Sequence, residues 1–297
     1  MRAKIFNCLL VFSSVICLVV LLFSVLHYTK KEVSSSKGAE KLYDTPMNFS
    51  KEDTGILILC YHRVLNENQL VKLGKTISSN SQLHSFNVEA KKFKEEMNFL
   101  KKNQIPVISI NEMLERIKKN QIDKKYVVIT FDDIDISIVQ NAFPVLNELN
   151  FPYTTFVITG QTSQYLDGSQ MANWSDIEKL AFNPLVTIGL HTDDMHYQEK
   201  NKPILSKKSS YKEFVKDYKA SIKHYSEHIA TQAPSLFASP YGVLQDNMAD
   251  YLYQQGIQAI FSLENGVVNS DSDLKRLPRV IVTDQSWKYL STWLLRK

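Results

Sequence analysis

Two adjacent carboxylates, Asp132 and Asp133, follow the apolar run YVVITF (126–131), at a point where a buried strand should end. Aspartates at such a junction commonly cap the next helix, and this is the simpler interpretation of an isolated pair. The alternative is a division of labour in which one carboxylate binds a metal ion and the other serves as a general base. The pair by itself leaves both interpretations open.

Two histidines, His191 and His196, follow the apolar run VTIGL (186–190) and lie five residues apart. On one regular α-helix their side chains would project about 140° apart, so a single helix face could not present both to one ion. They can share an ion if His191 ends a strand and the chain turns before His196, which the intervening Thr-Asp-Asp residues favour. Together with one aspartate they would form a two-histidine, one-carboxylate site. Zinc is the first expectation for such a site, and other divalent transition metals are the alternatives.

The elements that must position these residues alternate along the chain. Strand-like runs are ILILCYH (56–62), PVISI (106–110), YVVITFDD (126–133), YTTFVITG (153–160), VTIGLHT (186–192), SLFASPYG (235–242), IQAIFSL (257–263) and RVIV (279–282). Helices are expected over 86–103, near 111–119, near 135–149, over 174–182, over 211–230 and near 247–255. Near-continuous apolar strands separated by helices predict a parallel sheet covered on both faces, and about seven repeats favour an α/β barrel that is closed or nearly closed.

In a barrel of this kind the chemistry lies at the carboxyl ends of the strands. Asp132 and Asp133 end one predicted strand and His191 ends another. His62 ends the first strand, and the segment SPYG (239–242) ends a fourth. We therefore expect these residues to meet at one edge of the sheet.

The segments ILCYH, TFDD, H-x4-H and SPYG occur in this order, and the set resembles the polysaccharide deacetylases of carbohydrate esterase family 4, which share the NodB homology domain. The resemblance covers about residues 55–297. Most of this family has His-x3-His, so the spacing here is a departure. The longer spacing, the early Tyr61-His62 and a FASPYG segment without the usual arginine before Pro-Tyr resemble the branch that deacetylates poly-β-1,6-N-acetyl-D-glucosamine. The resemblance implies a deformed (β/α) barrel and a metal-dependent N-deacetylase.

The resemblance also implies roles for individual residues. Three residues would be the metal ligands, Asp133, His191 and His196. Asp132 would be the general base that takes a proton from the attacking water. The backbone N–H of Tyr241, which follows Pro240, would donate to the oxyanion.

The proton donor for the leaving amine has no such assignment. Most of the family has a histidine in a Leu-x-His motif near the C-terminus, but this chain reads LPRVIV at 277–282 and has no histidine after His228. His62 is one candidate, because it also ends a strand at the active edge, and it could instead shape the pocket through a hydrogen bond. His224 and His228 lie at helical spacing and are expected to face solvent without forming a second metal site. Trp174 is expected to pack in the core, with a place in the cleft wall as the alternative.

The N-terminus predicts the compartment. Residues Ile5–Leu26 carry no charge and are long enough to cross a bilayer, since about 20 apolar residues span the hydrocarbon core. The run is longer than a signal-peptide core and lacks an Ala-x-Ala-like site, so we expect an uncleaved anchor followed by an exported part. The predicted divisions are a membrane anchor or signal segment at 1–29, a linker at 30–54 and the deacetylase domain at 55–297. The protein would lie on the extracellular side of the cell membrane, or be secreted and associated with the cell surface.

Composition limits the partners. The chain has 35 Lys and Arg residues and 31 Asp and Glu residues, which gives a formal charge of +4. This small positive excess does not indicate a nucleic-acid-binding protein. Cys60 is the one cysteine after the N-terminal segment, so no disulfide can form within the exported part, and we expect it to be a buried strand residue.

We expect a monomer that deacetylates N-acetylglucosamine units of extracellular poly-β-1,6-N-acetyl-D-glucosamine and so promotes biofilm adhesion. A peptidoglycan or chitin-type deacetylase and a non-catalytic polysaccharide-binding module are the alternatives.

Overall fold

The computed structural model describes residues 52–66, 86–166, 169–229 and 233–296, which all belong to one compact unit. The predicted N-terminal anchor lies outside these residues, and so does nearly all of the predicted linker. None of the helices within the described ranges combines the length and the apolar character that crossing a bilayer requires.

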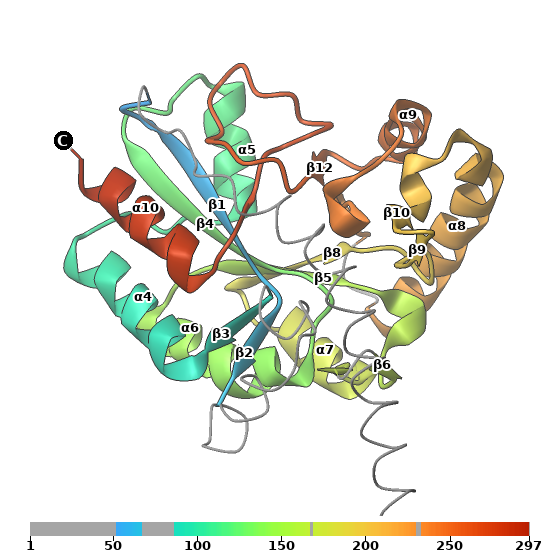
Figure 1. The fold of residues 1–297 in the computed structure, drawn as a ribbon, viewed down its shortest axis with the longest axis horizontal. Coiled ribbons are helices and arrows are strands. Elements are labelled where there is room, and N and C mark those ends of the chain that lie inside the picture. Colours follow the sequence, from blue (N-terminus) through green and yellow to red (C-terminus); the bar gives the residue numbers. More distant parts are fainter. Residues whose placement is uncertain (1–51, 67–85, 167–168, 230–232, 297) are drawn as a thin grey trace, which may run out of the picture. The chain divides into compact units, whose positions relative to one another are not determined.

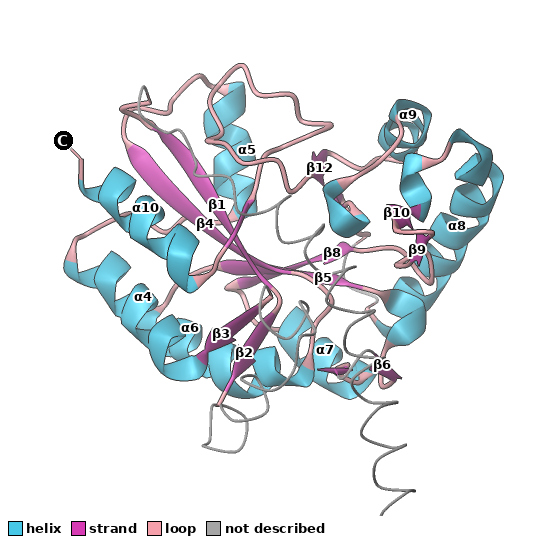
Figure 2. Ribbon diagram, viewed as in Figure 1, coloured by secondary structure: helices cyan, strands magenta, loops and turns pink. Residues whose placement is uncertain are grey.

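A parallel sheet of seven strands forms the centre of the unit (Figure 2). Its strands, in chain order, are β1 (Gly55–Tyr61), β4 (Lys125–Phe131), β5 (Tyr153–Val157), β8 (Val186–Leu190), β11 (Leu236–Ala238), β12 (Ala259–Phe261) and β13 (Val280–Ile281). Their order across the sheet is β12-β11-β8-β5-β4-β1-β13. The two edges approach each other, because Phe261 of β12 bridges Leu277 just before β13, and Ser262 N–H donates to the Leu277 carbonyl at 2.8 Å. The sheet thus curls into the deformed barrel that the sequence predicted.

Alternate residues of each strand face two different apolar cores. On β1, Leu57 and Leu59 contribute to one core, whereas Ile56 and Ile58 contribute to the other. Side chains of a strand alternate between its faces, so this pattern can be continued past the last residue of the strand. It places His62 on the same face as Ile56 and Ile58, which is the face toward which the sheet curls.

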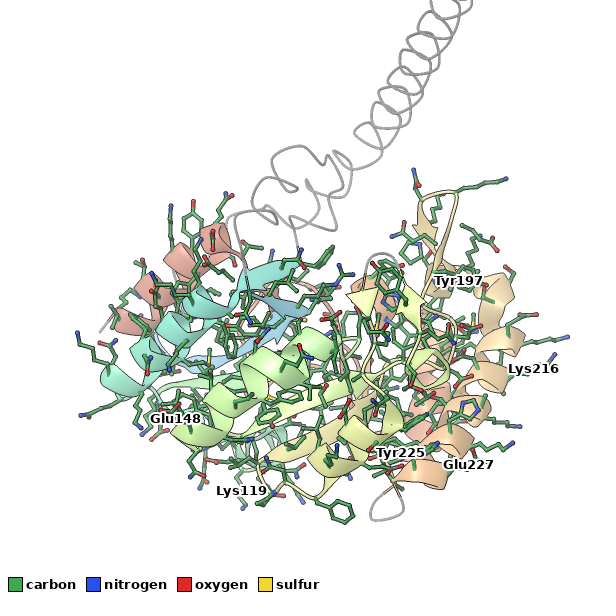
Figure 3. The ribbon with its side chains drawn as sticks, turned by 90° about the horizontal axis from the view of Figure 1, so that it is seen from below. Lys119, Glu148, Tyr197, Lys216, Tyr225 and Glu227 are labelled. Carbon is green, nitrogen blue, oxygen red and sulfur yellow. The ribbon has the colours of Figure 1, made fainter. Side chains whose placement is uncertain are left out.

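Helices cover both faces of the sheet (Figure 1). They are α4 (Ala90–Lys102), α5 (Ile110–Lys118), α6 (Phe143–Leu149), α7 (Trp174–Ala181), α8 (Tyr211–His228), α9 (Asp246–Gln254) and α10 (Asp284–Leu295). Helices α4 and α10 lie side by side, with the rings of Phe99 and Trp287 5.6 Å apart. Helix α8 turns Tyr225 toward the sheet and Lys216 and Glu227 away from it (Figure 3).

Short elements connect these strands and helices. The short strands are β2 (Arg63–Leu65), β3 (Asn87–Glu89), β6 (Tyr165–Leu166), β7 (Ser169–Gln170), β9 (Gln198–Glu199) and β10 (Lys202–Pro203). The short helical turns are η1 (Ile138–Ala142), η2 (Thr159–Gln161), η3 (Ile204–Ser206), η4 (Lys208–Ser210) and η5 (Pro240–Gly242). The helix expected near 135–149 is therefore divided, because the π-helical turn η1 precedes α6.

The prediction of a strand over 106–110 is wrong. Only Val107 pairs with the sheet, through a single parallel bridge to Val127 of β4. Ser109 accepts a hydrogen bond from the Glu112 N–H at 3.1 Å and so caps α5, which begins at Ile110. The helix cap outweighs the β-branched composition of this run.

Helix α10 is absent from the predicted elements. It begins with a capping box in which Thr283 accepts from the Ser286 N–H while the Ser286 side chain accepts from the Thr283 N–H. Leu290, Trp293 and Leu294 are buried against the rest of the unit. The serine in the third helical position is a weaker sequence signal than the usual glutamate or glutamine, so the cap is hard to recognise from sequence.

Candidate active site

The turn after β4 directs two adjacent carboxylates to different partners. Asp132 N–H donates to the Tyr61 carbonyl of β1 at 3.0 Å, so Asp132 continues the strand. Ile134 N–H then donates to the Asp132 carbonyl at 2.8 Å, which closes a three-residue turn with φ +68° at Asp133. Ile134 also has a positive φ of +55°, which is costly for a β-branched residue and persists only where its surroundings impose it. Because of this turn, the side chains of Asp132 and Asp133 point in different directions, although the two residues are neighbours in the chain.

His191 and His196 converge on Asp133. His191 directly follows β8, and its N–H donates to the Val157 carbonyl of β5 at 2.8 Å. The chain then turns at Thr192, with φ +71°, and brings His196 back to the same place. Nε2 of each histidine lies 3.4 Å from Oδ1 of Asp133. The three residues form a candidate metal-binding group, whose ligand atoms all lie within 4.8 Å of one another.

The chemistry of this group fits a divalent metal ion. Nδ1 of His191 donates to the Ala238 carbonyl at 2.8 Å, which leaves the lone pair of Nε2 directed at Asp133. Burial lowers the pKa of His191 to about 4, so the ring is neutral at pH 7 and can act as a ligand. Oδ1 of Asp133 is buried and has no hydrogen-bond partner among the described residues. Two imidazole nitrogens around an unsatisfied carboxylate oxygen are a donor set that zinc and similar ions prefer.

Asp132 is held by Arg279, a residue that no motif in the sequence marks as functional. The guanidinium donates to Oδ1 at 2.6 Å and to Oδ2 at 2.7 Å, and the side chains of Arg279 and Asp132 are 0% and 1% exposed. Such a bidentate pair is both strong and geometrically specific. Burial alone would raise the pKa of Asp132, but the Arg279 guanidinium outweighs it and holds the pKa of this carboxyl well below its usual range. Asp132 is therefore ionised at neutral pH, as a general base must be.

Arg279 itself is enclosed by residues from several strands. Its guanidinium carbon lies 5.3 Å from the centroid of the Phe156 ring and 5.8 Å from that of Phe261, and its Nε donates to the Ser262 carbonyl at 3.1 Å. Gly189 of β8 makes room for the Phe156 ring, because a Cβ at Gly189 would lie 2.6 Å from it. A single arginine in the run LPRVIV carries no local signal, so only the folded sheet reveals this support.

His62 and Cys60 complete the surroundings of Asp132. The potential ligand atoms of these three side chains lie within 4.8 Å of one another. The His62 ring lies against Phe86, with centroids 4.8 Å apart, and its Nδ1 is buried without a hydrogen-bond partner among the described residues. Burial lowers the pKa of His62, against the opposing effects of Asp133 and Asp132. Cys60 is buried and free, as predicted, and its Sγ lies 3.6 Å from Oδ2 of Asp132.

The segment after β11 brings Pro240 and Tyr241 to the same edge. They form the turn η5, in which Tyr241 has a positive φ of +55°. The centroid of the Tyr241 ring lies 4.8 Å from that of His196. Gly242 follows with φ +71°, and a Cβ there would lie 2.5 Å from the backbone nitrogen of Leu263. The turn therefore requires a glycine and places Tyr241 beside the candidate metal group.

His224 and His228 lie on α8 and are partly exposed, and each of them pairs with a carboxylate. Nδ1 of His224 lies 2.7 Å from Oδ1 of Asp193, in the loop between the two converging histidines, and the His224 side chain is 39% exposed. Nδ1 of His228 lies 2.8 Å from Oε1 of Glu178, and its ring stacks on the half-buried Trp174 at 4.3 Å. Neither histidine belongs to a metal-binding group in the described part of the chain.

Comparisons with known proteins identify a family model and related proteins. The family described as polysaccharide deacetylase matches residues 119–260. The solved structure of IcaB from Ammonifex degensii is similar to this chain with a TM-score of 0.72 and 27% identity, and the alignment covers 82% of this chain and 98% of that one. Residues 119–260 are thus identified as a polysaccharide deacetylase domain.

Two relatives of this deacetylase carry a more specific name. The poly-beta-1,6-N-acetyl-D-glucosamine N-deacetylase of Staphylococcus aureus (strain MRSA252) is 28% identical over 248 residues, which cover 83% of this chain and 85% of the relative. A protein of the same name from Staphylococcus epidermidis (strain RP62A) is 29% identical over 244 residues, covering 80% of this chain and 83% of the relative. The family match contains the predicted metal ligands and Asp132, whereas His62 and Arg279 lie outside it.

Proposed function

We propose that this deacetylase removes N-acetyl groups from the N-acetylglucosamine units of poly-β-1,6-N-acetyl-D-glucosamine by metal-dependent hydrolysis. The observation that carries the proposal is the convergence of Asp133, His191 and His196 at the edge where Asp132 also lies. The names of the staphylococcal relatives support the choice of polymer, because their alignments cover 83% and 80% of this chain.

Asp133, His191 and His196 would hold a divalent ion, and zinc is the ion that we expect. Bound there, it would polarise the acetyl carbonyl and lower the pKa of a water molecule. The chain contributes the fixed placement of the ligands. The Ala238 carbonyl orients the His191 ring, and the positive φ of Asp133 directs its carboxylate toward both histidines.

Asp132 would take the proton of the attacking water. Its carboxylate is already ionised, and Arg279 fixes both of its oxygens before a substrate arrives. A lowered pKa also makes a carboxylate a weaker base, so the pair gives up some proton affinity. What Arg279 contributes is therefore orientation and a constant charge state.

Cleavage of the amide needs two further contributions. As the water oxygen bonds to the acetyl carbon, negative charge develops on the acetyl oxygen, where it would accept a hydrogen bond from the backbone N–H of Tyr241 beside Pro240. As the carbon–nitrogen bond breaks, the departing amine must gain a proton. That proton would come from His62, or from Asp132 after it has taken the proton of the water. The products are acetate and a free amine.

The protein would work as a monomer on the extracellular side of the cell membrane, held by its predicted N-terminal segment, or secreted and retained at the cell surface. Each released amine turns a neutral sugar unit into a cation at neutral pH. A polymer with many such units would adhere to anionic cell-surface polymers. Biofilm adhesion is the biological consequence that we propose.

Acetate release measures the proposed function. Full-length, zinc-loaded protein is incubated with poly-β-1,6-N-acetyl-D-glucosamine, chitin oligomers and peptidoglycan at equal concentrations of N-acetyl groups. Faster acetate release from the β-1,6 polymer is the expected result, and faster release from either β-1,4 glycan would make that glycan the substrate. Binding of the β-1,6 polymer without any acetate release would instead make the protein a polysaccharide-binding module.

Substituting His62 by glutamine should separate the two routes for the amine proton. If His62 is the acid, it must be protonated when it acts, so activity is lost as the pH rises through its pKa. Burial lowers this pKa, which makes the protonated ring a stronger acid but leaves less of it protonated at pH 7. We expect His62→Gln to lower kcat, to flatten the alkaline limb of the pH profile and to leave the zinc content unchanged. A slow variant that keeps the same alkaline limb would show that His62 only shapes the pocket and that Asp132 returns the proton.

A further inference from the structure

The loop between the two converging histidines is held by a carboxylate from another element. Asp217 lies on α8 and is 9% exposed. Its Oδ2 accepts from the Asp193 N–H at 2.9 Å, and its Oδ1 accepts from the Asp194 N–H at 2.7 Å and the Met195 N–H at 3.0 Å. Three successive backbone donors directed at one carboxylate form an anion-binding nest, and here the anion is part of the protein.

A carboxylate is an expensive residue to bury at this position. Phe214, Tyr218 and Tyr225 are buried on the same helix. Burial raises the pKa of Asp217 to about 6, against the lowering effect of the backbone donors. Within the described part of the chain its hydrogen-bond partners are the three loop N–H groups, and none of them carries a charge. A small apolar residue would be buried here at less cost, so the packing of α8 does not explain the presence of Asp217.

The loop needs support because its backbone is strained. Thr192 is β-branched and has φ +71°, and its buried Oγ1 has no hydrogen-bond partner among the described residues. Such a conformation persists only where the surroundings impose it. The longer His-x4-His spacing adds a residue to the loop, and with it additional backbone freedom that must be restrained.

The short turn η2, which itself contacts α8, also holds the loop. Thr159 donates from its hydroxyl to Oδ1 of Asp193 at 2.6 Å, and Gly160 N–H donates to the Asp193 carbonyl at 3.0 Å. A Cβ at Gly160 would lie 2.8 Å from that carbonyl oxygen, so the close approach requires glycine. His224, two helical turns after Asp217 on α8, pairs with the Asp193 side chain. Both η2 and α8 therefore form hydrogen bonds that hold the loop.

We propose that Asp217 is a positioning residue that keeps the loop Thr192–Met195 in the conformation in which His191 and His196 face Asp133. It contacts the loop through backbone N–H groups and so acts on the ligands indirectly. The proposal rests on the proposed function, because it requires that the two histidines bind the ion. Residues that orient the ligands of a metal ion affect its binding even when they do not contact the ion themselves.

Asp217→Asn tests this role with little change in size. The side-chain amide of asparagine has only one oxygen, so its NH2 group faces at least one backbone N–H that Asp217 accepts from. At least one of the three hydrogen bonds to the loop is therefore lost. In the metal-free protein we expect several-fold faster hydrogen exchange at the amides of Asp193, Asp194 and Met195. We expect the zinc dissociation constant to rise about 10- to 100-fold, as for other groups that support a metal ligand. Excess zinc should restore kcat to within a few-fold of that of the unsubstituted protein, and KM for the polymer should not change.

Glu227→Gln is the matched control, because it makes the same chemical change on the outer side of α8 (Figure 3) and should alter none of these quantities. Unchanged zinc affinity in Asp217→Asn, with or without faster exchange, would overturn the proposal. Failure of the unsubstituted protein to bind zinc would instead overturn the proposed function. If Asp217→Asn does not fold, Asp217→Ser, which removes the carboxylate with a smaller side chain, tests the same three contacts, and unchanged zinc affinity there would contradict the proposal.

Discussion

Replacing Asp133 by asparagine should weaken zinc binding by more than about 100-fold and abolish acetate release, while the domain remains folded. The substitution removes one of three proposed ligands together with its negative charge. Loss of a group that only supports a ligand already costs about 10- to 100-fold in metal affinity, so loss of a ligand should cost more. Competition with a chromogenic chelator measures the affinity, and circular dichroism with thermal unfolding measures the fold.

Asparagine is preferable to alanine at this position for a structural reason. Asp133 has φ +68°, a conformation that asparagine adopts more readily than alanine. An alanine variant would therefore combine the loss of a ligand with strain in the turn. Glu148→Gln, the same chemical change at an exposed position on α6 (Figure 3), is the control and should behave like the unsubstituted protein. Zinc content and turnover that survive Asp133→Asn would show that the ligand assignment is wrong.

Substituting Asp132 by asparagine should leave zinc bound but lower kcat by about 100- to 10,000-fold, the usual contribution of a general base. The amide fills the same space, yet it cannot accept the proton of the water. It also leaves the Arg279 guanidinium buried without a negative partner, which is destabilising. Thermal unfolding must therefore be measured together with kcat and zinc content, so that the rate refers to folded protein.

Arg279→Lys provides the comparison for this second variant. Lysine keeps the positive charge beside Asp132 but replaces the two-pronged contact with a single donor group. We expect a smaller loss of kcat than in Asp132→Asn and no loss of zinc. If Asp132→Asn loses its zinc, Asp132 is a ligand, and if its turnover is near normal, Asp132 has no part in the mechanism.

The sequence predicted the parts of the site that depend on short-range patterns. Apolar runs located β1, β4 and β8, and the rule that barrel chemistry lies at the carboxyl ends of strands brought His62, Asp132 and His191 to one edge. The predicted turn between His191 and His196 is confirmed by the positive φ of Thr192. The prediction of a strand at 106–110 is wrong, because Ser109 caps α5 and the helix begins within this apolar run.

The residues that the sequence did not reveal act through long-range contacts. Arg279 lies 147 residues after Asp132, and Asp217 lies more than 20 residues after the loop that it holds. A lone arginine before a strand and a lone aspartate on an amphipathic helix are ordinary in sequence. Each becomes informative only when its burial is known, because a buried charge needs a specific partner. The roles of Gly160 and Gly189 are likewise hidden in the sequence, because only the folded structure shows that Gly160 approaches the Asp193 carbonyl and Gly189 the Phe156 ring.

The guanidinium that orients Asp132 enters the site with β13, the last strand of the sheet. A polypeptide emerging from the ribosome therefore presents Asp133, His191 and His196 well before it presents Arg279. Until β13 has docked beside β1, such a chain has its proposed metal ligands and a base without its bidentate arginine partner. Hydrolysis, unlike metal capture, would thus begin only after β13 has docked beside β1.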